Sequence, residues 1–323
     1  MSVPQYLRKA SLIVGADNGN AVDLSALRFA FAVRRGDIQT PNSADIRVYN
    51  PAPNTLTAIR EEFTRVVLQA GYDGNFGVIF DGQIKQVRRG RESQTDTYVD
   101  ITAADGDSAY NFSAMSVSLP AGTGNRDSVG QVLRAMSEFR IKRGYIPRDL
   151  PDNARVRGKV MYGMCRDEMR KIAANTDTSW SIQDGALDMI PLTAYKPGDI
   201  PVLNSATGVV GLPEQTQDGI RLKVLLNPNL KIGQAVKLDN DAIQRFRYNL
   251  AVKQQPVNDR SMRSNKLNED GLYYVMVADH QGDTRGQMWM TELTCLAINA
   301  DVPPSLIPKQ NVNDQISAIK RYG

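Results

Sequence analysis

Short runs in which apolar and polar residues alternate fill the first third of the chain and return in its last third. Between residues 12 and 101 they include "ALRFAFAVRRGD", "SADIRVYNP" and "TYVDITAADG". A period of two places every second side chain on one face, which is typical of a half-buried β-strand. The polar stretches "RRGD", "TPNS" and "RRGRESQTD" predict turns between antiparallel strands. The chain is therefore expected to be mainly β.

Helical spacing appears after residue 110. In "TGNRDSVGQVLRAMSEF", Asp127 or Ser128 is expected to cap a helix whose apolar face carries Val129, Val132, Leu133 and Met136. A second helix is predicted over about 163–175. It leads into "TSWSIQDGALDMIPL", where the Asp-Gly pair at 184–185 separates two alternating runs and favours a tight hairpin. Two helices followed by a hairpin predict a small α+β domain.

Strand patterns return at about residue 201, in "GIRLKVLLNP", "RFRYNLAV", "GLYYVMVADHQGD" and "MWMTELTCLAI". The polar stretch "KQQPVNDRSMRSNKLNEDG" between them predicts a long mobile loop. These changes along the chain predict a first β domain over 1–110, a small α+β domain over 111–200, a second β domain over 201–300 and a C-terminal tail over 301–323.

The bulk composition indicates a folded protein. The chain has 323 residues, of which 41% are hydrophobic, and a net charge of only +4, which gives little support to nucleic-acid binding. No secretory signal and no run of about 18 apolar residues is visible, so we expect folding in a cytoplasm and no membrane insertion. Cys165 and Cys295 each lie in an apolar pattern typical of a buried thiol, and a disulfide is not expected.

His280 is the single histidine and the first candidate for catalysis. It stands in "VADHQGDTRG" between Asp279 and Asp283, which resembles a general base with an orienting carboxylate. The segment has the pattern of a strand end and a turn, where a histidine more often bonds to backbone, and no nucleophile motif accompanies it. A structural or interface role is the favoured interpretation. One histidine and two distant cysteines also do not supply a metal site.

Other motifs have equally plain explanations. "AGTGN" lacks the G-K-[ST] of a phosphate-binding loop, so no cofactor is expected. "KQVRRGR" at 85–91 favours a solvated hairpin or a charged protein interface over a nucleic-acid patch. Trp180 and Trp289 lie in alternating strands, where packing in a core is favoured over sugar stacking. The residues alone therefore predict no catalytic, cofactor-binding or metal-binding site.

The order of several segments resembles a known family. "TPNSADIRVYNPAPNTL", "VVLQAGYDGNFGVIFDGQI" and "VDITAADGDSAYNFSAMSVSLPAGT" are followed by "CRDEMRKIAANTDTSWSIQDGALDMI", "GVVGLPEQTQDGIRLKVLLNPNLKIGQAVKL" and "GLYYVMVADHQGDTRGQMWMTELTCLAI". This layout, over about 25–298, is similar to that of the baseplate hub proteins of contractile-tailed bacteriophages, most closely the Mu-like group. Each segment alone is only moderately specific, but the same order is difficult to obtain by accident.

The resemblance implies a non-enzymatic structural protein of the virion. It implies a homotrimer in which each subunit contributes two similar β-barrel, tube-like domains, so that three subunits form a pseudo-sixfold ring. Such a hub would join the tail tube to the central spike, with the spike protein, tail-tube proteins and baseplate wedge proteins as partners. DNA would pass through its channel without specific binding, and assembly would take place in the host cytoplasm.

Two segments are candidates for packing or interfaces. In "AGYDGNFGVIFDGQI", Asp73 and the glycines are expected to form a turn, Tyr72, Phe76 and Phe80 to pack its corner, and Gly82 to permit a bend or bulge. An ordinary hairpin without partner contact explains the same residues. In the tail, a short docking helix and disorder are both open, and the candidate docking residues are Ile316, Ile319 and Tyr322.

Two alternatives from other classes stay open at this point. A cell-wall-degrading hydrolase would use His280 and its neighbouring carboxylates as the acid and base. A carbohydrate-binding β protein of the tail tip would use Trp180 or Trp289.

Overall fold

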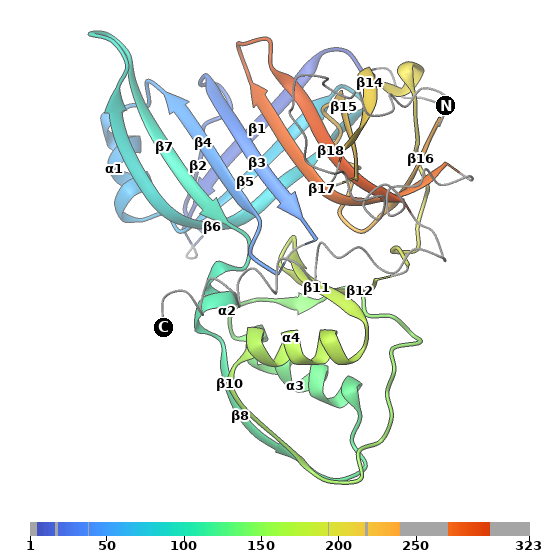
Figure 1. Cartoon of the computed structure of the whole chain (residues 1–323). Helices are drawn as coiled ribbons and strands as arrows, with labels where there is room; N and C mark the ends of the chain where they lie inside the picture. The colour runs from blue at the N-terminus through green and yellow to red at the C-terminus, as the bar shows by residue number, and fades with distance from the viewer. Residues whose placement is uncertain are drawn as a thin grey trace, which may run out of the picture.

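The computed structural model describes residues 5–16, 19–37, 39–192, 194–216, 219–239 and 271–297. Figure 1 shows a β layer with a small α+β unit packed against one of its ends. The mainly β fold with an α+β insert is therefore confirmed. The predicted strand "RFRYNLAV", the predicted loop over 253–270 and the tail at 301–323 lie outside the described residues.

The first β unit is an antiparallel sheet with one helix, α1 (Pro53–Glu61). Its hydrogen-bonded order is β3-β4-β7-β6-β5-β1-β2. The strands are β1 (Arg8–Gly15), β2 (Ala21–Asp23), β3 (Phe29–Gly36), β4 (Ser43–Tyr49), β5 (Arg65–Tyr72), β6 (Asn75–Arg91) and β7 (Thr97–Ala104).

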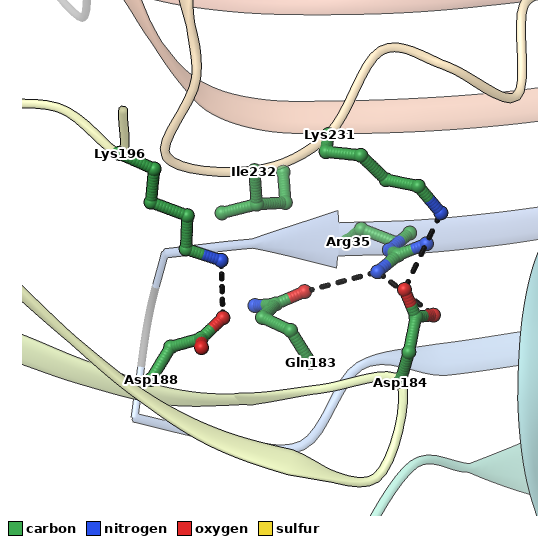
Figure 2. Close-up of a pocket in the computed structure, with 7 residues that line it drawn as sticks. All are labelled: Arg35, Gln183, Asp184, Asp188, Lys196, Lys231 and Ile232. Carbon is green, nitrogen blue, oxygen red and sulfur yellow. Dashed lines mark hydrogen bonds and ion pairs between the residues drawn. The ribbon is translucent and has the colours of Figure 1, made fainter. Parts of the chain in front are cut away.

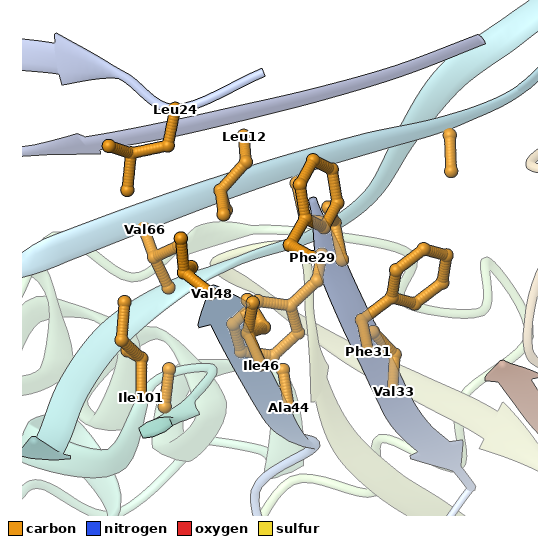
Figure 3. Packing of buried hydrophobic residues seen from close by; sticks show 14 of the residues in the cluster. Leu12, Leu24, Phe29, Phe31, Val33, Ala44, Ile46, Val48, Val66 and Ile101 are labelled. Carbon is orange, nitrogen blue, oxygen red and sulfur yellow. The ribbon is translucent and has the colours of Figure 1, made fainter. Parts of the chain in front are cut away.

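The core of this unit follows directly from the alternation in its strands. Phe29, Phe31 and Val33 of β3 face inward while the residues between them do not. Figure 3 shows them packed between the strands on either side of the curled sheet, with Leu12 and Val66 approaching from the opposite layer. The inward faces of strands on opposite sides of the curled sheet therefore form the two layers of this core.

The α+β unit contains both predicted helices and the predicted hairpin. Its elements are α2 (Asp107–Phe112), β8 (Ala114–Leu119), α3 (Asn125–Ser137), β9 (Lys142–Arg143), β10 (Lys159–Met164), α4 (Cys165–Asn175), β11 (Thr178–Gln183) and β12 (Ala186–Pro191). Asp184 and Gly185 join β11 to β12 with φ of 53° and 72°, the left-handed values that a two-residue turn requires.

Helix α3 starts earlier than its sequence predicts. Gly124 occupies the cap position, and its N–H donates to the Asp127 carboxylate 2.8 Å away. Asp127 therefore supports the helix start from inside the first turn, and the expectation that Asp127 or Ser128 is the cap is wrong. The apolar faces of α3 and α4 meet in a core of their own, where Val132, Met136 and Met169 are fully buried.

The second β unit has the order β14-β15-β18-β17-β16-β13. Its elements are β13 (Val202–Leu203), the 3-10 turn η1 (Ser205–Thr207), β14 (Val209–Thr216), β15 (Gly219–Leu225), β16 (Ala235–Leu238), β17 (Leu272–Asp283) and β18 (Trp289–Ala297). All neighbours pair antiparallel except β13 and β16. This unit has a third apolar core, in which Tyr273 and Leu293 are fully buried.

The two β units share one sheet. Residues Val277–Asp283 of β17 pair antiparallel with Ala30–Gly36 of β3, and we call this pairing the seam. In the described residues, the strand pairings do not close either unit into a separate barrel. The hydrogen-bonded path instead continues from one unit into the other. The seam fixes the two units side by side as a single body.

Candidate functional site

A polar junction lies where the α+β unit meets both β units. The hairpin of β11 and β12 brings its tip against the end of β3 and against the segment between β15 and β16. These elements enclose a cavity of about 190 Å³, lined by Arg35, Gln183, Asp184, Asp188, Lys196, Lys231 and Ile232 (Figure 2). We call these seven residues the junction.

Arg35 is the central cation of the junction. Its side chain is only 4% exposed, and its Nη2 lies 3.0 Å from Asp184 Oδ1. Nη2 also donates to Gln183 Oε1 at 3.3 Å, and Nη1 donates to the Ile79 carbonyl at 3.3 Å. Lys231 Nζ approaches the second oxygen of Asp184 to 3.3 Å. Asp184 therefore connects one cation from each β unit.

Buried amides complete the contact with the hairpin. Gln183 donates to the Gly36 carbonyl at 2.9 Å and accepts from Asn42 Nδ2 at 2.9 Å. Asn42 also donates to the Ile182 carbonyl and accepts from the Gly36 N–H. Both amides are largely buried. The end of β3 and the end of β11 are thus joined by directional bonds rather than by apolar packing.

A second polar group stands on the other side of the junction. Asp37 accepts from Ser179 Oγ at 2.7 Å and from the Tyr274 hydroxyl, so it connects the α+β unit to β17. Burial raises the pKa of Asp37, because a charged carboxylate is poorly solvated there. Lys196 forms an ion pair with Asp188. All three units contribute to this polar contact.

The surroundings of the junction shift the pKa values of two neighbouring carboxyl groups, Asp184 and Asp105, in opposite directions. Burial opposes ionisation of Asp184, but Arg35 and Lys231 outweigh it and lower its pKa. Burial, followed by repulsion from Asp184, raises the pKa of Asp105 to about 7. Asp105 accepts from the Gly185 N–H at 3.0 Å, beneath the hairpin tip. Every charged side chain that lines the cavity is in an ion pair, so these charges hold the three units together.

The residues expected to pack the turn of "AGYDGNFGVIFDGQI" divide into two groups. Tyr72 and Phe80 are 5% and 2% exposed, whereas Phe76 is 40% exposed, so the prediction that Phe76 packs the corner is wrong for the single subunit. The bulges of β6 lie at Ile79 and Lys85 instead of Gly82. Gly82 is required by close approach, since a Cβ there would stand 2.6 Å from the Phe80 ring and 2.7 Å from the Ala104 carbonyl oxygen.

His280 lies inside β17 instead of at a strand end, which corrects the expectation from its turn-like neighbours. It is 1% exposed, and its Nδ1 is 2.8 Å from the Thr291 hydroxyl oxygen, a side chain and not the backbone. Burial, then the cations Arg35 and Lys231, lowers its pKa to about 3. A substrate has no access to this imidazole, so the acid–base pair that a hydrolase would need is not assembled here.

Both tryptophans are buried. Trp180 is 1% exposed and Trp289 3% exposed, which leaves neither ring face open to a sugar. Trp289 belongs to β18 but packs in the core of the first β unit, with its ring centroid 5.5 Å from that of Phe31. Its indole N–H donates to the Gly71 carbonyl at 3.2 Å. Trp289 therefore connects the two β units from the core side of the seam.

The predicted tail residues, the two cysteines, and the expected lack of a metal site and of membrane insertion can be compared with the described residues. Ile316, Ile319 and Tyr322 lie outside the described residues. Cys165 and Cys295 are buried free thiols. No cluster of three or more His, Cys, Asp or Glu side chains suited to a metal ion occurs in the part of the chain that the structure describes. Among the helices of these residues, none has the length and apolar character needed to span a membrane.

The junction is the site that the sequence reasoning missed. Arg35 follows Phe29, Phe31 and Val33 at the same period of two, so its inward direction is visible in "FAFAVRR". An arginine on an inward face requires a buried partner. The partners, however, come from a hairpin about 150 residues away, and no local pattern identifies them.

No family model and no curated protein matches this chain. Solved structures share its fold. The 43 kDa tail protein of prophage MuSo2 from Shewanella oneidensis has a TM-score of 0.56 at 9% identity, with 92% of this chain and 99% of that chain covered. A tail protein from Neisseria meningitidis MC58 has a TM-score of 0.55 at 11% identity, with 92% and 98% covered.

A third similar structure is the half-lidded PdpA–VgrG complex of Francisella. The TM-score is 0.51 at 5% identity, and the match covers 93% of this chain but 60% of that chain. At these identities the comparison establishes a common fold. The chain therefore shares its fold with these two tail proteins over nearly their whole length.

Proposed function

We propose that this chain is a non-enzymatic structural protein of a phage tail, and within the tail the baseplate hub that joins the tail tube to the central spike. The observation that carries the proposal is the end-to-end fold match to two tail proteins, which covers 99% and 98% of those chains. The order of sequence segments independently resembles baseplate hubs. Both lines concern the whole chain and not one motif.

The internal contacts suit a load-bearing connector. The seam makes one sheet of two β units, and the junction fixes the α+β unit to both through paired charges and buried amides. Three separate apolar cores support a division into domains at about 1–110, 111–200 and 201–300, with 301–323 as a tail. A protein built of fixed, mutually bonded units transmits force without needing a reactive centre.

The partners in this proposal are two further copies of the chain, a spike protein, and tail-tube and wedge proteins. Three copies with two β units each would form a pseudo-sixfold ring around the channel through which DNA passes without specific binding. The similarity to a chain in a PdpA–VgrG complex supports a location next to a spike. The hub would act in the virion after assembly in the host cytoplasm.

The alternatives predicted from His280 and the tryptophans have no support in the described residues. The imidazole and both indoles are buried, and the cavity at the junction is lined by charges that are already paired. Neither a cell-wall hydrolase nor a carbohydrate-binding module is therefore proposed.

The experiment is a binding assay between the purified chain and the spike protein encoded beside it, followed by electron microscopy of the complex. The proposal predicts co-elution and a ring with the spike bound on one face. Absence of any complex at micromolar concentrations would contradict the hub assignment. Measurement of peptidoglycan turnover in the same samples, with His280→Ala as the control variant, tests the enzyme alternative: activity lost in that variant would overturn the non-enzymatic assignment.

A further inference from the structure

The two β units repeat one arrangement of five strands. In the first unit five consecutive strands, β3 to β7, pair in the order β3-β4-β7-β6-β5. In the second unit the five strands β14 to β18, consecutive among the described residues, pair in the order β14-β15-β18-β17-β16. An earlier strand of the chain extends each set at the same end: β1 pairs antiparallel with β5, and β13 pairs parallel with β16. Within this pattern β6 corresponds to β17, and β3 corresponds to β14.

The correspondence extends to single residues. The register of β6 with β7 shifts between Ile84 and Gln86, and that of β17 with β18 shifts between Val275 and Val277. Ile84 pairs with Ala103 as Val275 pairs with Cys295. Counting from these bulges makes Arg89 the counterpart of His280. Bulges are specific features of a strand, so a shared position supports a true structural repeat.

The repeat is incomplete at one place. Beyond its bulge, β17 is covered by β3 along the seam. Beyond its bulge, β6 pairs with β7 on one side only, and across the described residues no strand covers Gln86–Arg91 on the other. The counterpart of β3 is β14, which pairs only with β15 in the same part of the chain. Among the described residues, each chain therefore presents both halves of a second seam without joining them.

The two open edges are complementary in charge. Arg88, Arg89 and Arg91 are exposed on β6, and no carboxylate of the described residues forms an ion pair with them. On β14, Glu214 is exposed, and Val210 and Leu212 are 47% and 55% exposed. Open strand edges with apolar side chains favour pairing with another chain.

The edges also lie on opposite sides of the molecule. The protruding hairpin of β6 and β7 is at the upper left of Figure 1, and β14 is at the upper right. Because the two edges differ and lie on opposite sides, a contact between them is head-to-tail, and repetition of such a contact closes a ring when the rotation allows it.

We infer that β14 of one copy pairs antiparallel with Gln86–Arg91 of β6 in a second copy and thereby repeats the seam between chains. Transfer of the seam register places Gln215 opposite Arg89 of the second copy, as Val33 lies opposite His280. Glu214 then lies opposite Gly90, on the same sheet face as Arg88 and diagonal to it. The inference deepens the proposed hub function, on which it rests, by naming the surface that joins its subunits.

Disulfide trapping tests the register. Directly opposed residues of antiparallel strands have Cα atoms roughly 4.5–5.5 Å apart, within the span of a disulfide. Gln215→Cys combined with Arg89→Cys should form disulfide-linked dimers and higher species on mild oxidation. The matched control is Gln215→Cys with Arg88→Cys, because adjacent residues of a strand point to opposite faces. The native Cys165 and Cys295 are buried and contribute little background.

Light scattering on the same samples separates the two proposals. Oligomers that cross-link through the 215–89 pair and not through the 215–88 pair support the inter-chain seam. Oligomers without the 215–89 cross-link overturn the seam and leave the ring-forming hub intact. A monomer without any cross-link, both alone and in the presence of the spike protein, overturns both.

Charge reversal provides a second test that needs no oxidation. Glu214→Arg places a cation among the arginines of the facing strand and should weaken association by about two- to fivefold per contact, the usual effect of a cross-strand pair. The double variant Glu214→Arg with Arg88→Glu should recover most of that loss. Equal association of all three proteins would overturn the inferred pairing.

Discussion

Beyond its bulge at Met276, β17 pairs with β3 and its inward side chains are buried. Beyond its bulge at Lys85, β6 has one edge that no strand of the described residues covers. The same strand of one repeated pattern thus carries buried His280 in the second unit and exposed Arg89 in the first. The difference shows how a covering strand in the same chain decides what its neighbour can carry. At these two corresponding positions the covered edge holds a buried neutral imidazole, and the open edge holds a solvated cation.

We expect the largest loss of stability from a substitution that removes packing between the two β units behind the seam. Trp289→Ala removes the indole that β18 places in the core of the first unit, together with its bond to the Gly71 carbonyl. We expect a loss of about 3–5 kcal/mol in the free energy of unfolding, measured by urea denaturation. Thr97, the counterpart of Trp289 in the first unit, is the control, and Thr97→Ala should cost less than about 1 kcal/mol. Similar losses for both would contradict the comparison.

The next effect concerns the cation at the end of the covered seam. Arg35→Met removes the buried cation that pairs with Asp184 and donates to Gln183, and it should cost about 2–3 kcal/mol in unfolding free energy. This loss of unfolding free energy is smaller than that expected for a completely buried ion pair, because the Asp184 side chain is 40% exposed and water can solvate its charge. The neighbouring Arg34 is exposed on the opposite face, so Arg34→Met is a matched control that should change stability little. Thermal denaturation of the two variants decides the point.

The pH dependence of stability tests the polar contact below the seam. The pKa of Asp105 is raised from 3.8 to about 7, so the folded protein binds this proton more tightly than the unfolded chain. The stability it contributes is full below pH 4 and is lost as the pH rises through about 7. Asp105→Asn keeps an acceptor for the Gly185 N–H and should be more stable than the parent by about 2 kcal/mol at pH 8.

Denaturation of both proteins from pH 4 to pH 8 checks this prediction. The difference in unfolding free energy between them should grow as the pH rises, because only the parent has to ionise a buried carboxyl group. His280, whose pKa is lowered from 6.5 to about 3, acts in the opposite direction: its contribution is full above pH 6.5 and is lost as the pH falls through about 3. It titrates alike in both proteins, so it cancels. Parallel pH profiles would show that Asp105 is not held protonated.

A smaller effect is expected at the two corresponding positions themselves. His280→Ala removes the contact with the Thr291 hydroxyl inside the covered strand and should cost about 1–2 kcal/mol. Arg89→Ala changes an exposed side chain and should shift the unfolding free energy by less than about 0.5 kcal/mol. Urea denaturation of both variants measures the contrast, and equal costs would mean that the edge of β6 is also covered in the isolated chain.

Local patterns in the sequence carry the parts of the fold that depend on neighbouring residues. "FAFAVRRG" gives β3 and its inward face, and the Asp-Gly pair at 184–185 gives the hairpin of β11 and β12. The apolar stripes give helices α3 and α4. Each of these follows from spacing along a few residues, which physics couples directly to side-chain direction.

The seam and the junction depend on contacts between distant segments. "ADHQGD" has the composition of a turn, yet β17 continues through it because β3 supplies a full row of hydrogen-bonding partners. Strand β8 also depends on a distant partner, because its pairing with β10 joins segments separated by helix α3 and a long loop. No residue close in sequence to His280 or Arg35 indicates which distant segment will pack against it. Strand pairing over more than two hundred residues is a property of the whole fold.

The most direct test of the ring-forming hub is the solution mass of the purified chain, measured by light scattering alone and then mixed with the spike protein. A ring-forming hub would have a mass of about 107 kDa, three times the 35.7 kDa of one chain, alone or within a complex with the spike. A strict monomer of 35.7 kDa under both conditions would contradict it.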